Sequence, residues 1–398
     1  MIRRFLVCLS FCLLATYAQA DNRITIGEIL SIKSEILEED RPYWVYLPDS
    51  YNDETGFPSK YPVLYLLDGD GFFHSATGLV QYMSAGIYIN TQIPEMIVVA
   101  IPNTDRTRDL TPTHSTADDD GKEAPYLKTS GGGDKFLRFI RDELQPKIDS
   151  TYRTEAFNIL VGHSFGGLLA AHALLEPEQI FQAYIAIDPS LSWDDSVVLR
   201  RARSVIESGG ALQGRVYLTT ANTVVPGYDS KLVDGPVVED VVALIQSAAS
   251  PELHVRHDYY EAEDHTSVPT LSLYHGLLFV FDGYKPPLAL FYGEPSALKA
   301  HFKRVSDRLG ITLLPLETLV NGAGYEMLYS EQDVDKAIEL FTLNTVNYPE
   351  SSNVYDSLAE AYMVNGDKAL AIANYEKSLE LDSDNQNAVE QLETLRAE

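Results

Sequence analysis

Cysteine is nearly absent from this chain of 398 residues, which has only Cys8 and Cys12. Both lie in an amino-terminal segment that we expect to be removed, so the mature protein would have none. A chain without cysteine cannot form disulfides, use a thiolate as nucleophile or bind a metal through sulfur. Its stability must come from a hydrophobic core, and its length is sufficient to build one.

The amino-terminal segment has the three parts of a secretory signal peptide. Arg3 and Arg4 supply its positive charge. The apolar region Phe5–Leu14 follows, and Ala18-Gln19-Ala20 is a small-residue cleavage site. The apolar region is shorter than the roughly 20 residues that a membrane-spanning helix needs. We therefore expect residues 1–20 to be a cleaved signal and the mature protein to be periplasmic or secreted.

Positive charge is also scarce, because 30 Lys and Arg residues face 58 Asp and Glu residues and the formal net charge is −28. Loss of Arg3 and Arg4 with the signal peptide would take the net charge to −30. Such a surface repels the phosphates of nucleic acids and anionic membranes. We expect neither as a partner and interpret the acidic excess as a means of solubility.

Strand-like and helix-like segments alternate between residues 21 and 292. An opening antiparallel meander is expected at Ile24–Leu30, Ser31–Leu37 and Tyr43–Leu47. The other expected strands are mostly apolar runs, namely Pro62–Leu67, Met96–Ile101, Phe157–Val161, Ala183–Ile187, Arg215–Thr220 and Leu253–Tyr260. The helices expected between them are Gly132–Asp149, Phe165–Leu175, Asp195–Ser208 and Val237–Ala249. This alternation predicts an α/β domain with a mainly parallel sheet, helices on both sides and ligands at the carboxyl ends of the strands.

A second, all-α domain is expected at residues 293–398, where the strand-like runs end. Residues 318–351 and 352–385 are similar stretches with the residue types and spacing of tetratricopeptide repeats, and residues 386–397 follow as a capping helix. The pairs of corresponding positions include Ala337 with Ala371 and Phe341 with Tyr375.

Two such repeats are few for an independent solenoid, so we expect them to pack on the first domain or on another subunit. Three roles are open for this part of the chain. It could be a lid over the first domain, the contact of a homodimer, or a groove that binds a protein partner.

The segment Gly162-His163-Ser164-Phe165-Gly166-Gly167 fits the motif G-x-S-x-G. It follows the apolar run Phe157–Val161 and precedes a small-residue helix that extends to Leu175. A strand, this turn and a helix are the context of a nucleophile elbow, which exposes the serine hydroxyl on a strained turn. Glycines on either side let the backbone pass closely. We therefore expect Ser164 to be a nucleophile.

A serine hydroxyl is a weak nucleophile and needs a base. In hydrolases with this elbow the acid and the histidine follow the serine along the chain. His265 lies just past the last expected strand, in a loop before the expected helix Thr270–Phe281. Such a loop can bring the imidazole back over the elbow, so His265 is the expected base.

The acid that orients the imidazole is expected after the strand Arg215–Thr220. The first acidic residue there is Asp229, which is the preferred candidate. Asp188 and Asp194 follow the preceding strand and are alternatives. A Ser-His pair without an acid, oriented by a backbone carbonyl, is a further alternative.

An oxyanion needs two backbone N–H groups aimed at the developing charge. One is expected from Phe165, the residue after the nucleophile. The other is expected from the loop that follows the strand Pro62–Leu67, at Gly69 or Asp70.

Several motifs in chain order resemble one family of α/β-hydrolases, which includes esterase D-like enzymes and enterochelin/salmochelin (catecholate siderophore) esterases. They are Tyr65-Leu66-Leu67-Asp68-Gly69, Thr104–Pro112, Gly162–Gly167, Asp188-Pro189-Ser190-Leu191-Ser192-Trp193 and Glu263-Asp264-His265. The resemblance covers roughly residues 25–285 and implies an α/β-hydrolase fold, Ser164 as nucleophile and His265 as base. Periplasmic siderophore esterases of this group are described as using a Ser-His pair. The helical tail is a departure from those enzymes.

The resemblance also implies that Arg106–Pro112 forms a wall of the active site. By its chemistry, Arg106 or Arg108 could bind an anionic group of the substrate. Ion pairs with Asp105 or Asp109 are the alternative use of these arginines. Trp193, in the fourth motif, is a further candidate for a substrate contact.

These features together predict a serine esterase that hydrolyses a small-molecule ester through an acyl-enzyme. No metal or organic cofactor is expected, because the sequence shows no cluster with the spacing of a metal site. An acyltransferase or thioesterase that uses the same elbow is an alternative. An inactive hydrolase fold that serves as a binding scaffold is another.

Overall fold

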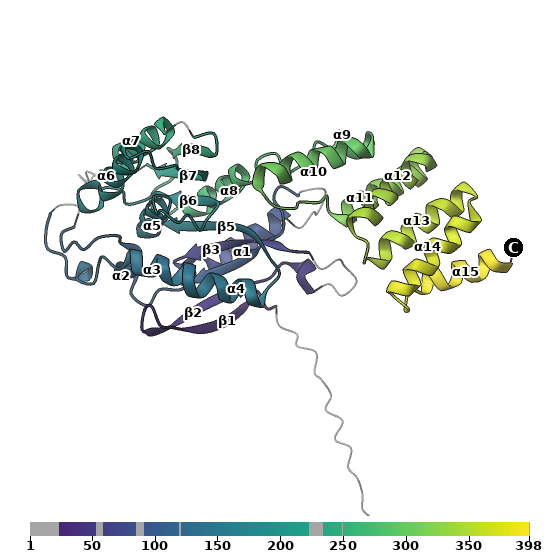
Figure 1. Ribbon diagram of the computed structural model, residues 1–398, viewed down its shortest axis with the longest axis horizontal. Coiled ribbons are helices and arrows are strands. Elements are labelled where there is room, and N and C mark those ends of the chain that lie inside the picture. The colour runs from purple at the N-terminus through teal and green to yellow at the C-terminus, as the bar shows by residue number, and fades with distance from the viewer. Residues whose placement is uncertain are drawn as a thin grey trace, which may run out of the picture.

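The computed structural model describes residues 24–52, 59–84, 91–118, 121–222, 234–248 and 250–397. The expected signal peptide and the preferred acid Asp229 lie outside these ranges. Within them, no helix combines the length and the apolar character needed to cross a membrane. The chain forms a sheet flanked by helices, followed by a row of helices that extends away from the sheet (Figure 1).

An eight-stranded sheet forms the centre of the first part of the chain (Figure 1). Its strands are β1 (Glu28–Ser34), β2 (Glu39–Tyr46), β3 (Tyr61–Leu67), β4 (Ile97–Ile101), β5 (Thr154–His163), β6 (Ala183–Ile187), β7 (Gly214–Ala221) and β8 (Leu253–Tyr260). Their spatial order is β1-β2-β4-β3-β5-β6-β7-β8. β2 is antiparallel to both of its neighbours, and the other pairs are parallel. The mainly parallel sheet is thereby confirmed, and each of the six expected strands is present, although β8 is half-exposed and alternates apolar with polar residues.

Two elements differ from the sequence-based prediction. The first two expected strands of the meander are one strand, β1, because the chain reverses at residues 35–38, where Glu38 adopts a φ of 62°. The sequence reading also missed helix α1 (Gly69–Ser84), which begins directly after β3. Its glycines at positions 69, 71 and 78 are weak helix formers and hid the helical pattern.

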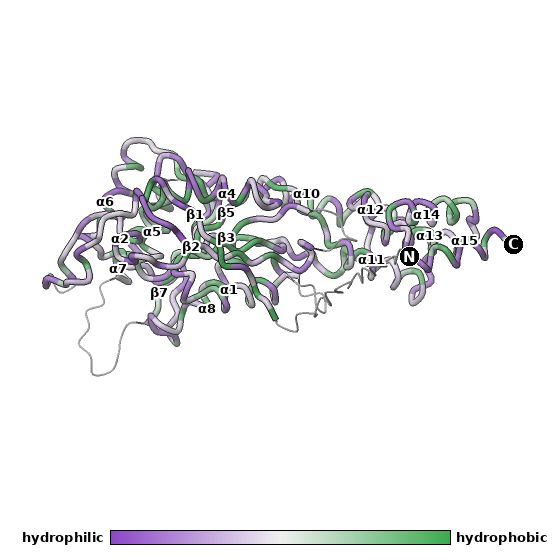
Figure 2. Tube along the Cα trace, turned by 90° about the horizontal axis from the view of Figure 1, so that it is seen from below, coloured by the Kyte–Doolittle hydropathy of each residue, from purple (hydrophilic) through white to green (hydrophobic). Residues whose placement is uncertain are grey.

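Both faces of the sheet are covered by helices. α1 and α8 (Pro269–Val280) pack on one face with Leu64 and Leu66 of β3. The opposite face, with Tyr65, packs against a second set of helices. These are α2 (Arg106–Leu110), α3 (Gly133–Phe139), the π-helical η4 (Ile140–Leu144), α4 (Gln145–Thr151), α5 (Phe165–Ala173), α6 (Trp193–Glu207) and α7 (Asp234–Ser247). Figure 2 shows the apolar residues gathered along the central strands, and all of β3 is buried.

The rest of the described chain is helical. Its elements are α9 (Ala289–Tyr292), α10 (Pro295–Leu309), α11 (Glu317–Tyr325), the π-helical η5 (Glu326–Glu331), α12 (Val334–Asn347), α13 (Ser352–Asn365), α14 (Lys368–Leu381) and α15 (Gln386–Ala397). The helices α11 to α15 fall at the positions expected for two repeats and a cap. The corresponding residues are fully buried, namely Ala337, Ala371, Phe341 and Tyr375. That these helices are tetratricopeptide repeats stays a prediction.

The helical part packs at the amino-terminal ends of the parallel strands. Tyr61, the first residue of β3, and Glu155 near the start of β5 line one cavity together with Leu313 and Tyr348. Tyr284, after α8, packs edge-on against Phe302 of α10, with ring centroids 5.8 Å apart. A single hydrophobic cluster joins the sheet to the helices. Because Ser164 lies at the carboxyl ends of the strands, a lid over Ser164 does not agree with this position.

Candidate active site

Ser164 lies on a strained turn between β5 and α5. Its backbone angles are φ 60° and ψ −117°, a conformation that a non-glycine residue adopts only where the surrounding structure enforces it. A Cβ atom on Gly162 would lie 2.2 Å from the carbonyl oxygen of Gly166, so only glycine permits this close approach. The turn is the nucleophile elbow that the motif predicts.

The end of β6 holds the elbow in place. The Ser164 N–H donates to the Ile187 carbonyl at 3.0 Å, and the Ser190 N–H donates to the Ser164 carbonyl at 3.2 Å. The two serine hydroxyls also lie 3.4 Å apart, within hydrogen-bond distance. In the part of the chain that the structure describes, the hydroxyl partner of Ser164 is thus Ser190 and not His265. Sequence reasoning missed Ser190, whose only signal was its place in the fourth motif.

His265 is paired with Asp188, one of the alternative acids. The imidazole Nδ1 lies 2.6 Å from Oδ2 of Asp188, which directly follows β6. The other carboxylate oxygen accepts the N–H of Ala221 at 2.9 Å, and the Asp188 side chain is 6% exposed. The preferred candidate, Asp229, lies outside the described residues. The carboxylate beside the imidazole therefore comes from the end of β6, whereas the sequence favoured the segment after β7.

His163, the residue before Ser164 in the elbow, lies beside His265. Its ring centroid is 4.4 Å from that of His265 and 5.9 Å from that of Phe72. Burial, and to a smaller extent the charge of His265, lower the pKa of His163 to about 4. His163 is therefore neutral at neutral pH and adds no positive charge beside His265.

Two helices begin at the site with N–H groups in their first turns. Phe165 opens α5, and Gly69 and Asp70 open α1. First-turn N–H groups have no acceptor within their helix, and the helix dipole adds partial positive charge there. A Cβ on Gly166 would lie 3.3 Å from the Asp68 carboxylate, so the loop before α1 touches the elbow. The structure thus brings together the helix starts from which the sequence predicted an oxyanion hole.

Arg106 ties this loop to the elbow. Its Nε and Nη2 donate to the two carboxylate oxygens of Asp68 at 2.6 and 3.0 Å, and Nη2 also donates to the His163 carbonyl at 3.3 Å. Its guanidinium lies 5.4 Å from the ring centroid of Phe165. The sequence left open whether Arg106 binds substrate or forms an ion pair with Asp105 or Asp109. In the structure Arg106 forms an ion pair, and its partner is Asp68.

Arg108 belongs to a structural ion-pair network. It donates to Asp109 at 2.7 Å and to both carboxylate oxygens of Glu39 at 2.7 and 3.1 Å. The hydrogen bond from Arg108 lowers the pKa of Glu39 to about 2. All these contacts support the structural alternative for Arg108 over substrate binding.

Trp193 stands behind the site. Its side chain is 5% exposed, and its indole N–H donates to the Thr113 hydroxyl at 3.2 Å. The indole packs edge-on against Phe165, with ring centroids 5.2 Å apart. Trp193 therefore supports Phe165 and presents little surface to a substrate.

A serine on a strained turn after a strand of a mainly parallel sheet, close to a His-Asp pair, defines a protein of the α/β-hydrolase type. The chain belongs to the family described as "Putative esterase", whose model matches residues 34–264.

The similar proteins include siderophore esterases. A siderophore triacetylfusarinine C esterase of Aspergillus fumigatus is 27% identical over 284 residues, covering 62% of this chain and 92% of that protein. The ferri-bacillibactin esterase BesA of Bacillus subtilis is 33% identical over 174 residues, covering 41% of this chain and 58% of that protein.

Solved structures extend the similarity. An IroE-like serine hydrolase from Shewanella oneidensis is 31% identical with a TM-score of 0.70, covering 80% of this chain and 99% of that one. An uncharacterised protein from Capnocytophaga ochracea is 18% identical with a TM-score of 0.59, covering 94% of this chain and 100% of that one. The second likeness concerns the fold alone, and it includes most of the helical part.

Proposed function

We propose that this esterase works through Ser164 as nucleophile, His265 as general base and Asp188 as the acid that orients His265. The contact of 2.6 Å between His265 Nδ1 and Asp188 carries the proposal. With Nδ1–H donating to the carboxylate, the lone pair of Nε2 is available to take the Ser164 proton.

The reaction proceeds through an acyl-enzyme. Ser164 Oγ attacks the ester carbonyl as its proton passes to His265, and the N–H groups of Phe165 and of Gly69 or Asp70 stabilise the oxyanion. His265 then gives the proton to the leaving alcohol. Water, activated by His265, attacks the acyl carbon and releases the acid and free Ser164.

The Ser164 hydroxyl must turn from Ser190 toward His265 for this step. Catalytic hydrogen bonds commonly tighten only when substrate is bound. Ser190 therefore acts in the proposal as a resting partner of the nucleophile.

The proposed substrate is a small-molecule ester that reaches a periplasmic or secreted enzyme. The relatives named as siderophore esterases make siderophore esters the first substrates to test. The departure of the helical tail from those relatives calls for sugar acetates, feruloyl esters and simple acyl esters in the same screen.

Kinetics with p-nitrophenyl acetate test the role of Ser164. We expect Ser164→Ala to lower kcat by roughly 10³-fold or more while leaving the fold unchanged. Ser247→Ala is a matched control, because Ser247 lies exposed on α7 and its hydroxyl donates to the carbonyl of Leu244 in the same helix. Full activity of a folded Ser164→Ala variant would show the proposal to be wrong.

A further inference from the structure

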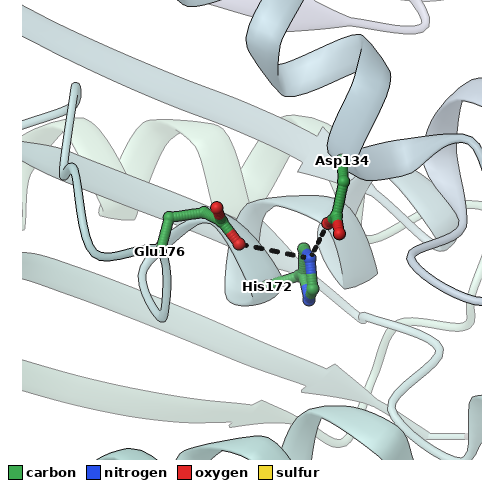
Figure 3. Close-up of side chains that lie close together, drawn as sticks. All are labelled: Asp134, His172 and Glu176. Atoms are coloured by element: carbon green, nitrogen blue, oxygen red, sulfur yellow. Dashed lines mark hydrogen bonds and ion pairs between the residues drawn. The ribbon is translucent and has the colours of Figure 1, made fainter.

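A second cluster of chemically active side chains lies away from Ser164, at the far end of α5. His172 in the last turn of α5, Glu176 after it and Asp134 of α3 point toward one another (Figure 3). His172 Nε2 lies 2.7 Å from Asp134 Oδ1 and 3.7 Å from Glu176 Oε1. One nitrogen and two carboxylate oxygens therefore converge within 4.8 Å of one another.

Arg201 of α6 occupies the same place, beside His172 Nε2. Its Nη1 lies 2.8 Å from that nitrogen, and its Nη2 lies 2.5 Å from Glu176 Oε1. Nη1 also lies 3.3 Å from His172 Nδ1, so an imidazole whose Nε2–H donates to Asp134 can accept from Arg201 at Nδ1. Arg201 also pairs with both Asp134 and Glu176, so the two carboxylates share a single guanidinium charge.

We propose that this cluster is a binding site for a divalent transition-metal ion of the zinc class, which displaces the Arg201 guanidinium. A metal ion on the lone pair of His172 Nε2 would be shared with the Asp134 and Glu176 oxygens, which converge on that nitrogen. Imidazole nitrogen and carboxylate oxygen are both zinc ligands in proteins.

The distances suit such an ion. Zinc bonds of about 2.0–2.2 Å in tetrahedral geometry put neighbouring ligand atoms about 3.3 Å apart. The two distances from Nε2, 2.7 and 3.7 Å, lie on either side of that value, so small side-chain rotations are sufficient. The side chain of His172 is 3% exposed and fixes one ligand, whereas that of Asp134 is 63% exposed and leaves a path for the ion and its water.

Electrostatics favour a cation at this point. The last turn of α5 presents the negative end of its helix dipole, which stabilises positive charge. Two carboxylates and one neutral imidazole balance the charge of a divalent ion, whereas Arg201 supplies only one positive charge.

Sequence inspection found no cluster with metal-site spacing. The His172 and Glu176 pair has the i, i+4 spacing of ligands on one helix, but the third ligand is far away along the chain. Only the packing of α3 against the end of α5 brings Asp134 to the pair.

Zinc titration of the untagged protein by calorimetry tests the proposal, with Co²⁺ absorption as a second measurement. We expect one equivalent to bind and the melting temperature to rise. Asp134→Asn and Glu176→Gln should each weaken zinc binding by about 10-fold to 100-fold or more, since even supporting residues of metal sites have effects of this size. Glu178→Gln is the matched control, because Glu178 is two residues away and pairs with Arg141.

Arg201→Gln separates a metal site from an ion-pair network. If the guanidinium competes with the ion, this variant should bind zinc more tightly than the native protein. Ser164→Ala should bind zinc with native affinity, so the result is independent of the proposed esterase mechanism. Failure to bind zinc, or binding that Asp134→Asn and Glu176→Gln leave unchanged, would overturn the proposal.

Discussion

Ser164 and Asp188 share an unusual backbone conformation. Each directly follows the end of a parallel strand, and their φ values are 60° and 38°. Positive φ at a non-glycine residue costs roughly 1–3 kcal/mol. The hydrogen bonds between the two turns, from Ser164 N to Ile187 and from Ser190 N to Ser164, help to hold this strain. The two side chains thereby reach the same edge of the sheet.

Asp188→Asn tests which acid orients His265. We predict a fall in kcat on the order of 10³- to 10⁴-fold, because the amide can turn an NH₂ toward Nδ1 and stabilise the wrong tautomer. The fold should survive, since the amide oxygen can still accept the Ala221 N–H. Asp229→Asn is the control and should keep activity close to native. The reverse result in steady-state kinetics would return the role to Asp229.

His163 should make stability depend on pH. Its pKa is about 4 in the folded protein against 6.5 for an ordinary histidine, so the unfolded chain binds more protons between these values. Stability that is present above pH 6.5 is therefore lost as the pH falls toward 4, by about 2–3 kcal/mol. We predict that His163→Gln loses less free energy of unfolding between pH 7 and pH 4 than the native protein does. Denaturant unfolding at the two pH values measures this loss. Identical losses in both proteins would contradict the lowered pKa of His163.

The sequence predicted Ser164 and His265 because each has a local signal, a glycine-bounded turn and a loop after the last strand. Asp188 could be named only as an alternative. Its role depends on the loop after β8 returning to the end of β6, which is a property of the packed sheet. Ser190 and the Arg106 to Asp68 ion pair depend on the same packing and have no local signal.

The loop between β3 and α1 is the element that joins the oxyanion donors to the elbow. Arg106 holds it through two parallel hydrogen bonds to Asp68, a geometry that lysine cannot reproduce. A shift of this loop would misplace the N–H groups of Gly69 and Asp70. Loss of the ion pair between Arg106 and Asp68 should therefore lower the catalytic rate more than the affinity for substrate.

Arg106→Lys should lower kcat by about tenfold with little change in KM, a fraction of the effect of removing an oxyanion donor outright. Arg108→Lys is the matched control and should affect stability instead, because Arg108 pairs with Glu39 and Asp109 away from the elbow. Steady-state kinetics and thermal melts of both variants check this. Equal kcat values in the two variants would contradict the role given to Arg106.

Among the secondary-structure elements, the apolar strands were predicted well from the sequence, and the predicted limits of β6 and β8 are the observed ones. Each is a continuous apolar or half-apolar run bounded by polar residues. α1 was missed because three glycines interrupt its pattern, and β1 was divided because its exposed residues gave no sign of where the chain reverses. Both errors are in segments where tertiary packing decides the local structure.

The molecule as a whole has its candidate active site and its helical part at opposite ends of the parallel strands (Figure 1). The composition change near Tyr292 predicted that a helical part exists. Its attachment could not be predicted, because it depends on contacts such as Tyr284 with Phe302. An integral structural role for α10 to α12 follows from the shared hydrophobic cluster.

Truncation after Tyr292 should prevent stable folding. It removes several large buried side chains of the shared cluster, including Phe302 and Phe341, each worth roughly 1.5–3 kcal/mol against a total stability of about 5–15 kcal/mol. Truncation after Asn385 is the control and should fold, because α15 packs in a small separate cluster. Circular dichroism and thermal melts test both. A folded protein with native kinetics that ends at Tyr292 would contradict the integral role.

In the proposed mechanism Ser164 is a nucleophile activated by His265. The most direct measurement is intact-protein and peptide mass spectrometry after reaction with a fluorophosphonate probe. We predict a single adduct on Ser164, none on Ser164→Ala, and strongly slowed labelling of His265→Ala. A folded native protein that takes up no probe, or an adduct on another residue, would contradict it.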